Sequence, residues 1–195
     1  MSAVGAGPYP AGMTVSAFLA CSLDGFIAEP DGGLAWLTSP PSDVVDSSGL
    51  GSDDTGYDAF VADKDAIVMG RGTFDVVAGF DPWPYPLPVV VLTGRPLPEA
   101  LPGGAEVSAL AGGPAEVVAA LGAQGRDRLY VDGGQVVTAF LAAGLLDEIV
   151  ITVVPVVLGA GIPLFGAVAG HRWFHHVSTR VLGGAYVQSH YRRRG

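Results

Sequence analysis

The order of its apolar segments limits what this chain can fold into more than any other feature of the sequence. Segments rich in Val, Ile and Leu alternate with helical segments up to about residue 143. Such apolar segments are typical of buried strands, and strands that alternate with helices form a mostly parallel sheet with helices on its faces. We predict strands at residues 13–21, 66–69, 89–93, 105–108 and 128–132, and helices at residues 57–62, 74–78, 114–121 and 135–143.

The pattern changes near residue 148, where apolar segments follow one another without helices. Residues 148–158, 174–182 and 186–193 are predicted strands, and Gly183-Gly184 suits a tight hairpin turn. The predicted fold class is therefore α/β, with three layers (α-β-α), a mostly parallel mixed sheet and a C-terminal antiparallel hairpin. We expect one domain over residues 13–195, preceded by a disordered N-terminal extension at residues 1–12.

Charge and cysteine content exclude several classes of partner and location. A formal net charge of −9 argues against nucleic acid, because proteins that bind it present a basic face to its phosphates. Cys21 is the only cysteine, and no secretion signal precedes it, so we expect a cytoplasmic protein. The most apolar segment, residues 149–158, contains Pro155 and is too short to cross a membrane.

Turns containing glycine follow three of the predicted strands, at residues 69–73 (MGRGT), 93–95 (TGR) and 132–136 (DGGQV). Ligands of open α/β sheets bind at the carboxyl ends of the strands, where helix N-termini attract phosphate. The turns therefore predict a nucleotide site, with turns that are only structural as the alternative. The chain has neither the Rossmann glycine pattern nor a Walker A loop.

Four motifs resemble the dihydrofolate reductase-like superfamily, in particular its branch with the reductase domain of riboflavin biosynthesis. They are S-L-D-G-F-I-A at residues 22–28, M-G-R-G-T-F at 69–74, D-G-G at 132–134 and P-V-V-L-G-A-G at 155–161. The resemblance covers residues 14–191 and implies the dihydrofolate reductase-like fold, NADPH as cofactor and a homodimer. We expect the apolar strand 148–158 to form the seam of that dimer.

The same resemblance implies which residues contact NADPH. They are Ala20 and Ile27 beside the nicotinamide, Gly70, Arg71 and Thr73 at phosphates and ribose, Thr93, Gly94 and Arg95 on the adenosine side, and Gly133, Gly134, Gln135 and Val136 at the pyrophosphate. An arginine at position 95 suits a ribose 2′-phosphate. The cofactor then performs hydride transfer, so no metal ion and no covalent nucleophile are required.

A proton must accompany the hydride, and two carboxylates are candidate catalytic residues. Asp54 lies near the start of the predicted helix 57–62, where folate-reducing members carry an acid, but it can equally be a helix-start carboxylate. Asp24 is expected near the active site, or else it shapes the turn before Gly25. Trp36 is expected to contact the substrate, with a place in the core as the alternative.

Metal binding and hydrolysis have little support in the sequence. The adjacent His175 and His176 point to opposite faces of a predicted strand, and with His171 they lack the Cys or carboxylate ligands of a metal site. The G-x-S-x-G motif of hydrolases is absent.

Three functions remain open, each with a small-molecule partner. The preferred one is an NADPH-dependent reductase that transfers hydride to a pterin- or pyrimidine-like heterocycle. The alternative is the 5-amino-6-(5-phosphoribosylamino)uracil reductase of riboflavin biosynthesis, although the zinc deaminase motif that usually accompanies it is absent. A nucleotide-binding module without turnover is the second alternative.

Overall fold

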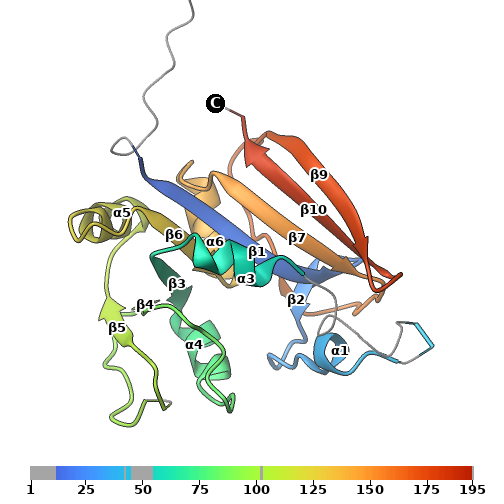
Figure 1. Cartoon of the computed structure of the whole chain (residues 1–195), viewed down its shortest axis with the longest axis horizontal. Helices are drawn as coiled ribbons and strands as arrows, with labels where there is room; N and C mark the ends of the chain where they lie inside the picture. The colour runs from blue at the N-terminus through green and yellow to red at the C-terminus, as the bar shows by residue number, and fades with distance from the viewer. Residues whose placement is uncertain (1–11, 42, 45–54, 102, 195) are drawn as a thin grey trace, which may run out of the picture.

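The computed structural model describes residues 12–41, 43–44, 55–101 and 103–194. Within them, one eight-stranded sheet has the order β5-β4-β3-β6-β1-β7-β10-β9 (Figure 1). Its strands are β1 (Thr14–Ser22), β3 (Ala66–Gly70), β4 (Val89–Leu92), β5 (Val107–Leu110), β6 (Arg128–Asp132), β7 (Glu148–Val154), β9 (Phe174–Leu182) and β10 (Tyr186–Arg193). Two short strands that were not predicted, β2 (Phe26–Ala28) and β8 (Ile162–Pro163), pair with each other. Residues 1–11 of the predicted extension lie outside the described residues.

The sheet is parallel from β5 to β7 and antiparallel at one edge. β1 pairs in parallel with both β6 and β7, and β3 pairs in parallel with β4 and β6. β10 runs antiparallel to β7, and β9 runs antiparallel to β10 as the outer strand of a hairpin. This arrangement confirms the mostly parallel mixed sheet with a C-terminal hairpin.

β7 is shorter than predicted, and it lies inside the sheet. It ends at Val154, because Pro155 has no N–H to continue the ladder, and the Val156 N–H instead donates to the carbonyl of Val154 at 2.8 Å. β7 is hydrogen-bonded to β1 on one side and to β10 on the other. Both hydrogen-bonding edges of β7 are thus occupied within the subunit, so the homodimer seam expected at this strand could not form by pairing along an edge.

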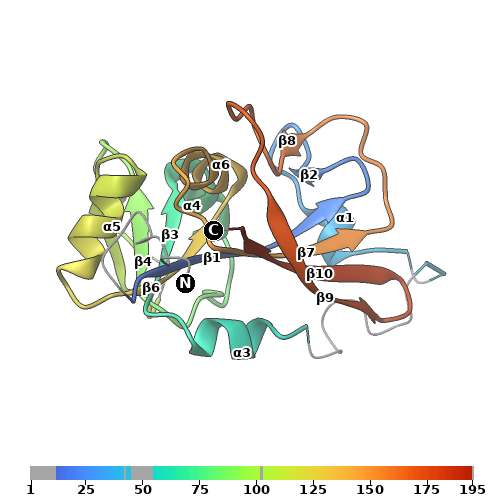
Figure 2. The same ribbon diagram turned by 90° about the horizontal axis from the view of Figure 1, so that it is seen from above.

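Helices cover both faces of the sheet, which confirms the three layers. They are α1 (Ala35–Thr38), α3 (Tyr57–Ala62), α4 (Arg71–Val77), α5 (Pro114–Gly122) and α6 (Gly134–Ala142). Val15 and Ala17 of β1 pack with α5 and α6, while Ile67 and Met69 of β3 pack with Phe74 of α4 on the other face. Figure 2 shows α6 and α3 on opposite sides of the sheet. Among the described helices, none is long and apolar enough to span a membrane.

Two of the glycine turns join a strand directly to a helix. Gly70 is extended (φ −77°, ψ 161°), so α4 begins at Arg71 rather than at the predicted Phe74, and the M-G-R-G-T motif supplies its first turn. Gly133 has a φ of +88°, a left-handed conformation that favours glycine, and α6 begins at the next residue. Both motifs therefore place a helix N-terminus at the carboxyl end of a strand.

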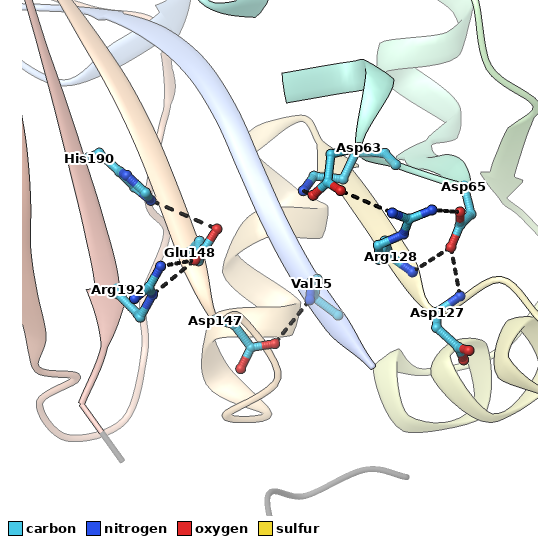
Figure 3. A network of polar contacts seen from close by, with 10 residues as sticks. Val15, Asp63, Asp65, Asp127, Arg128, Asp147, Glu148, His190 and Arg192 are labelled. Carbon is cyan, nitrogen blue, oxygen red and sulfur yellow. Dashed lines mark hydrogen bonds and ion pairs between the residues drawn. The ribbon is translucent and has the colours of Figure 1, made fainter. Parts of the chain in front are cut away.

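Ion pairs tie together the opposite, amino-terminal ends of the parallel strands (Figure 3). At the start of β6, Arg128 contacts Asp63 at 3.0 Å and Asp65 at 2.8 Å. At the start of β7, Glu148 contacts Arg192 at 2.9 Å. These arginines lie at the end of the sheet away from the glycine turns.

Candidate functional site

The carboxyl ends of β1, β3 and β6 surround a cavity of about 340 Å³. Its wall also includes residues around β2, the first turns of α4 and the turn into α6. Eight of the residues expected to hold the cofactor are in this wall: Ala20, Ile27, Gly70, Thr73, Gly133, Gly134, Gln135 and Val136. The sheet thus gathers at one place three segments that are far apart in the sequence.

The other residues expected to hold the cofactor lie outside the cavity wall. They are Arg71, Thr93, Gly94 and Arg95. Arg71 donates from Nε to Asp75 Oδ1 at 2.6 Å and from Nη1 to the carbonyl of Pro96 at 2.9 Å, so it joins α4 to the loop after β4. In that loop, Thr93 Oγ1 accepts a hydrogen bond from the N–H of Arg95 at 3.0 Å.

The two glycine turns in the cavity wall touch each other. A Cβ on Gly133 would overlap the hydroxyl of Thr73, and a Cβ on Gly134 would overlap the carbonyl oxygen of Pro163. A Cβ on Gly72, in contrast, would meet no atom within 4 Å. Packing alone therefore requires glycine at positions 133 and 134, while Gly72 leaves open space beside the cavity.

The N-terminus of α6 gives the cavity a binding group for anions. The first amides of a helix have no acceptor inside the helix, and the helix dipole adds a partial positive charge there. Gly134, Gln135 and Val136 form this first turn and line the cavity. Backbone amides of this kind suit the pyrophosphate of a dinucleotide, so the residues present fit NADPH.

Asp132, at the end of β6, supplies a carboxyl group to the same wall. Its Oδ1 accepts a hydrogen bond from the N–H of Gly133 at 2.8 Å, and its Oδ2 accepts one from the hydroxyl of Tyr85 at 2.8 Å. Burial disfavours the charged carboxylate and raises the pKa of Asp132, although the two hydrogen bonds act in the opposite direction. This carboxyl therefore keeps its proton to a higher pH than an exposed aspartate does.

Three tyrosines surround Asp132 on the α3 side of the sheet. Burial, and in second place the nearby charge of Asp132, raises the pKa of Tyr57, Tyr85 and Tyr130. The hydroxyl of Tyr130 donates to the carbonyl of Phe18 at 3.0 Å. The phenols stay protonated at neutral pH, so Tyr85 acts as a hydrogen-bond donor toward Asp132.

Asp24 lies in the turn after β1 and outside the cavity wall. Its carboxylate accepts hydrogen bonds from Ser22 Oγ at 2.6 Å, from Leu158 N at 3.2 Å and from Gly159 N at 2.7 Å. These bonds, with the one from Ser22 as the largest cause, lower the pKa of Asp24. The contacts are those of a residue that joins two loops in its charged form.

Of the remaining predicted site residues, Trp36 lies beside the main cavity, and Asp54 is not described by the structure. Trp36, on α1, lines a neighbouring pocket of about 290 Å³ together with Val154 and Tyr186, whereas Leu37 of the same helix lines the main cavity. Asp54 lies outside the described residues. Across the described part of the chain, no group of three His, Cys, Asp or Glu side chains is placed to hold a metal ion.

Asp132 and Tyr85 were not among the residues predicted for the site. Asp132 stood in the D-G-G motif, and a carboxylate between a buried strand and a glycine pair could have been noticed. Tyr85 lies in the irregular segment between α4 and β4, where no periodicity marks a functional residue. The apolar part of the wall, including Phe18, Leu34 and Phe80, carried no signal either.

Known proteins resemble this chain in sequence and in structure. Residues 13–187 match the RibD C-terminal domain. The uncharacterized protein YwjB of Bacillus subtilis is 34% identical over 179 residues, which are 90% of this chain and 95% of that protein.

Two solved structures share the fold. A putative riboflavin biosynthesis protein of Shewanella sp. PV-4 is 38% identical, with a TM-score of 0.82 over 94% of this chain and 100% of that one. The dihydrofolate reductase of Enterococcus faecalis, solved with NADP(H), is 20% identical, with a TM-score of 0.60 over 93% of this chain and 97% of that one. The second comparison confirms the dihydrofolate reductase-like fold.

Proposed function

Since this chain belongs to the RibD C-terminal domain family, we propose that it is an NADPH-dependent reductase that transfers hydride to a small heterocyclic substrate. One observation carries the proposal: a carboxyl group with a raised pKa, that of Asp132, lies in the cavity wall where the two glycine turns meet. A cavity at the carboxyl ends of the strands thus contains both a cradle for a dinucleotide and a source of protons.

The glycine turns and the first strand would hold the cofactor. The amides of Gly134 and Gln135 would bind its pyrophosphate, and Gly72 leaves room for a phosphate beside α4. Ala20 and Ile27, both in the cavity wall, would flank the nicotinamide. Bound in this way, NADPH supplies the hydride. Arg71 and Arg95 lie beyond the wall, so their role would be on the adenosine side.

Asp132 would supply the proton that accompanies the hydride. Its raised pKa keeps the carboxyl protonated closer to neutral pH, which is the property of an efficient general acid. Tyr85 fixes the orientation of this carboxyl through its hydrogen bond of 2.8 Å. Asp24 suits the role less well, because it is charged and is occupied by three hydrogen-bond donors.

The apolar part of the wall would hold the heterocycle and exclude water. Phe18 of β1, Leu34 and Leu37 at α1, and Phe80 after α4 come from three different segments and line the cavity together. A reacting ring enclosed by these side chains is kept from bulk solvent, which strengthens its interactions with Asp132.

The location and the oligomeric state of the protein are also proposals. We expect the protein to act in the cytoplasm and as a homodimer, in which β9, one of the two outer strands of the sheet, would contact a second copy. Sedimentation equilibrium at several protein concentrations tests the dimer, and a single monomeric species would contradict it.

The cofactor and the enzyme activity are tested in sequence. First, NADPH and NADH are titrated into the protein while its tryptophan fluorescence is followed, and failure of both to bind contradicts the proposal. Second, the loss of nicotinamide absorbance is followed with pterin, pyrimidine and 5-amino-6-(5-phosphoribosylamino)uracil acceptors. If NADPH binds but none of these acceptors causes its oxidation, the result would instead favour a nucleotide-binding module without turnover.

A further inference from the structure

The described part of the wall of the main cavity contains one carboxylic acid and no basic side chain. Of the described residues that line the cavity, Asp132 is the only one with a carboxyl group, and none is Lys, Arg or His. The other polar side chains in the wall carry the hydroxyls of Tyr85 and Thr73 and the amide of Gln135. The described residues of the wall therefore offer a substrate hydrogen-bonding groups and apolar surface, but no cation.

The segment between β1 and β3, part of which lies outside the described residues, also lacks basic residues in its sequence up to residue 63. Residues 1–63 contain no Lys, Arg or His, whereas they contain nine Asp or Glu. The loops that follow β1, which contribute Gly32, Leu34 and Leu37 to the cavity, cannot supply a positive charge from within this segment.

The basic residues nearest in sequence are engaged elsewhere. Lys64, which follows this segment, contacts Asp63 at 3.3 Å and lies 4.7 Å from the centre of the Phe60 ring. Arg71 is held by Asp75 and by the carbonyl of Pro96. Other arginines, such as Arg128, pair with acids at the amino-terminal ends of the strands (Figure 3).

A phosphate group on the substrate would be poorly accommodated in such a cavity. It would lose part of its hydration without gaining a cationic partner, and it would lie near a carboxyl group in a net acidic protein. The amides at the start of α6 are the anion-binding groups of the wall, and the pyrophosphate of the cofactor would occupy them. The same reasons disfavour a free carboxylate on the substrate.

We infer that the substrate is a neutral heterocycle without phosphate or carboxylate, and that its ring nitrogen is recognised by Asp132 and Tyr85. This inference rests on the proposed reductase function and separates the protein from a reductase of 5-amino-6-(5-phosphoribosylamino)uracil. The reaction reduces a C=N bond: hydride from NADPH adds to the carbon, a proton from Asp132 adds to the nitrogen, and solvent returns a proton to Asp132. NADPH and one proton are consumed, and NADP⁺ and the dihydro product are formed.

The inference is tested with two matched pairs of ligands. One pair is 5-amino-6-ribosylaminouracil and its 5′-phosphate, and the other is dihydrobiopterin and dihydrofolate, which carries carboxylates. Calorimetry measures binding of each compound to the whole 195-residue chain, and loss of nicotinamide absorbance measures kcat/KM. In at least one pair, the neutral member is expected to bind about ten-fold more tightly or more and to have the higher kcat/KM. Equal or tighter binding of the anionic members, or no binding of either neutral member, overturns the inference.

A variant with an added cation provides a second measurement. Phe80 lies in the cavity wall and is 41% exposed, so a longer polar side chain can reach both cavity and solvent. Phe80→Arg is expected to strengthen binding of the 5′-phosphate about ten-fold relative to the matched Phe80→Leu variant. No difference between these variants would show that charge does not select the substrate. Because calorimetry needs no cofactor, the inference can be judged even if NADPH does not bind, which would contradict the proposed function alone.

Discussion

The hydroxyl of Tyr85 donates a hydrogen bond of 2.8 Å to Oδ2 of Asp132, although 47 positions separate the two residues. Asp132 ends β6 and Tyr85 lies in the segment between α4 and β4, so the pair joins two sides of the cavity. The hydrogen bond fixes the one carboxyl group among the described residues of the cavity wall. Several measurable properties depend on this pair.

Asp132→Asn is expected to lower kcat by about 10²–10⁴-fold, the range for loss of a general acid. The amide has a similar size and can still accept hydrogen bonds, but it cannot deliver a proton. Steady-state kinetics measures the effect, and a titration with NADPH should show nearly unchanged affinity. Asp24→Asn is the matched control, because Asp24 holds loops outside the cavity. A larger loss of kcat in the Asp24 variant would reverse our assignment of the proton donor.

The stability of the protein should depend on pH through Asp132. Its pKa is raised in the folded state, so its contribution to stability is fully present below the unfolded pKa of about 3.9 and is lost as the pH rises through the folded pKa. Asp132→Asn removes this dependence. Urea unfolding at a series of pH values measures the free energy of unfolding of both proteins. The stability of the variant relative to the parent protein should therefore increase as the pH rises. A difference in stability that does not change with pH would contradict the raised pKa.

Tyr85→Phe should move the pH profile of activity to higher pH. The hydrogen bond from Tyr85 lowers the pKa of Asp132, so its removal lets burial raise that pKa further. The protonated, active form then persists to higher pH, while kcat falls because the carboxyl is less well oriented. The profile of kcat against pH measures both effects. Tyr191→Phe, on the distant strand β10, is a suitable control. If the alkaline limb of the profile moves to lower pH in Tyr85→Phe, Tyr85 does not have the proposed role toward Asp132.

Gly72→Ala separates cofactor binding from stability. The new Cβ meets no atom within 4 Å, and alanine in a helix is favoured over glycine by roughly 0.5–1 kcal/mol, so the melting temperature should stay the same or rise. NADPH should bind about ten-fold more weakly if a phosphate approaches this turn. Gly103→Ala, which also meets no atom within 4 Å, is the control in an exposed loop. Unchanged affinity in the Gly72 variant would place the phosphates elsewhere.

Arg71→Ala should weaken NADPH binding by about 1.5–3 kcal/mol, the range for hydrogen bonds to charged groups. This requires Arg71 to exchange Asp75 for a phosphate, so Asp75→Asn should leave NADPH affinity equal or higher. Arg95→Ala should affect NADPH more than NADH, because only NADPH carries the 2′-phosphate. Fluorescence titrations compare the two cofactors, with Arg126→Ala as a control that breaks a distant pair with Glu106. If Arg71→Ala binds NADPH normally, Arg71 serves only to join α4 to the next loop.

The strands were the most predictable part of the molecule. The predicted bounds of β6, β9 and β10 agree with the structure, because their apolar residues and the adjacent glycines are local signals. The starts of α4 and α6 were less accurate, since a glycine can either end a strand or open a helix. β2 and β8 were missed because each is very short and pairs only with the other.

The candidate site was predictable where it consists of backbone. The turns at residues 69–73 and 132–136 were expected to converge, and the parallel sheet brings Thr73 against Gly133. The side chains were less predictable. Asp24 was expected to act in catalysis, but its hydrogen bonds to Leu158 and Gly159 depend on a loop far along the chain.

The sequence by itself determined the α/β class, the strand–turn–helix units and the absence of basic residues before Lys64. These properties follow from local periodicity, glycine positions and composition. Only the tertiary structure decided that β7 lies inside the sheet, that Arg71 reaches the carbonyl of Pro96, and that Tyr85 reaches Asp132. Such contacts depend on how long loops bring distant residues together, and burial at the resulting site, rather than residue type, raises the pKa of Asp132.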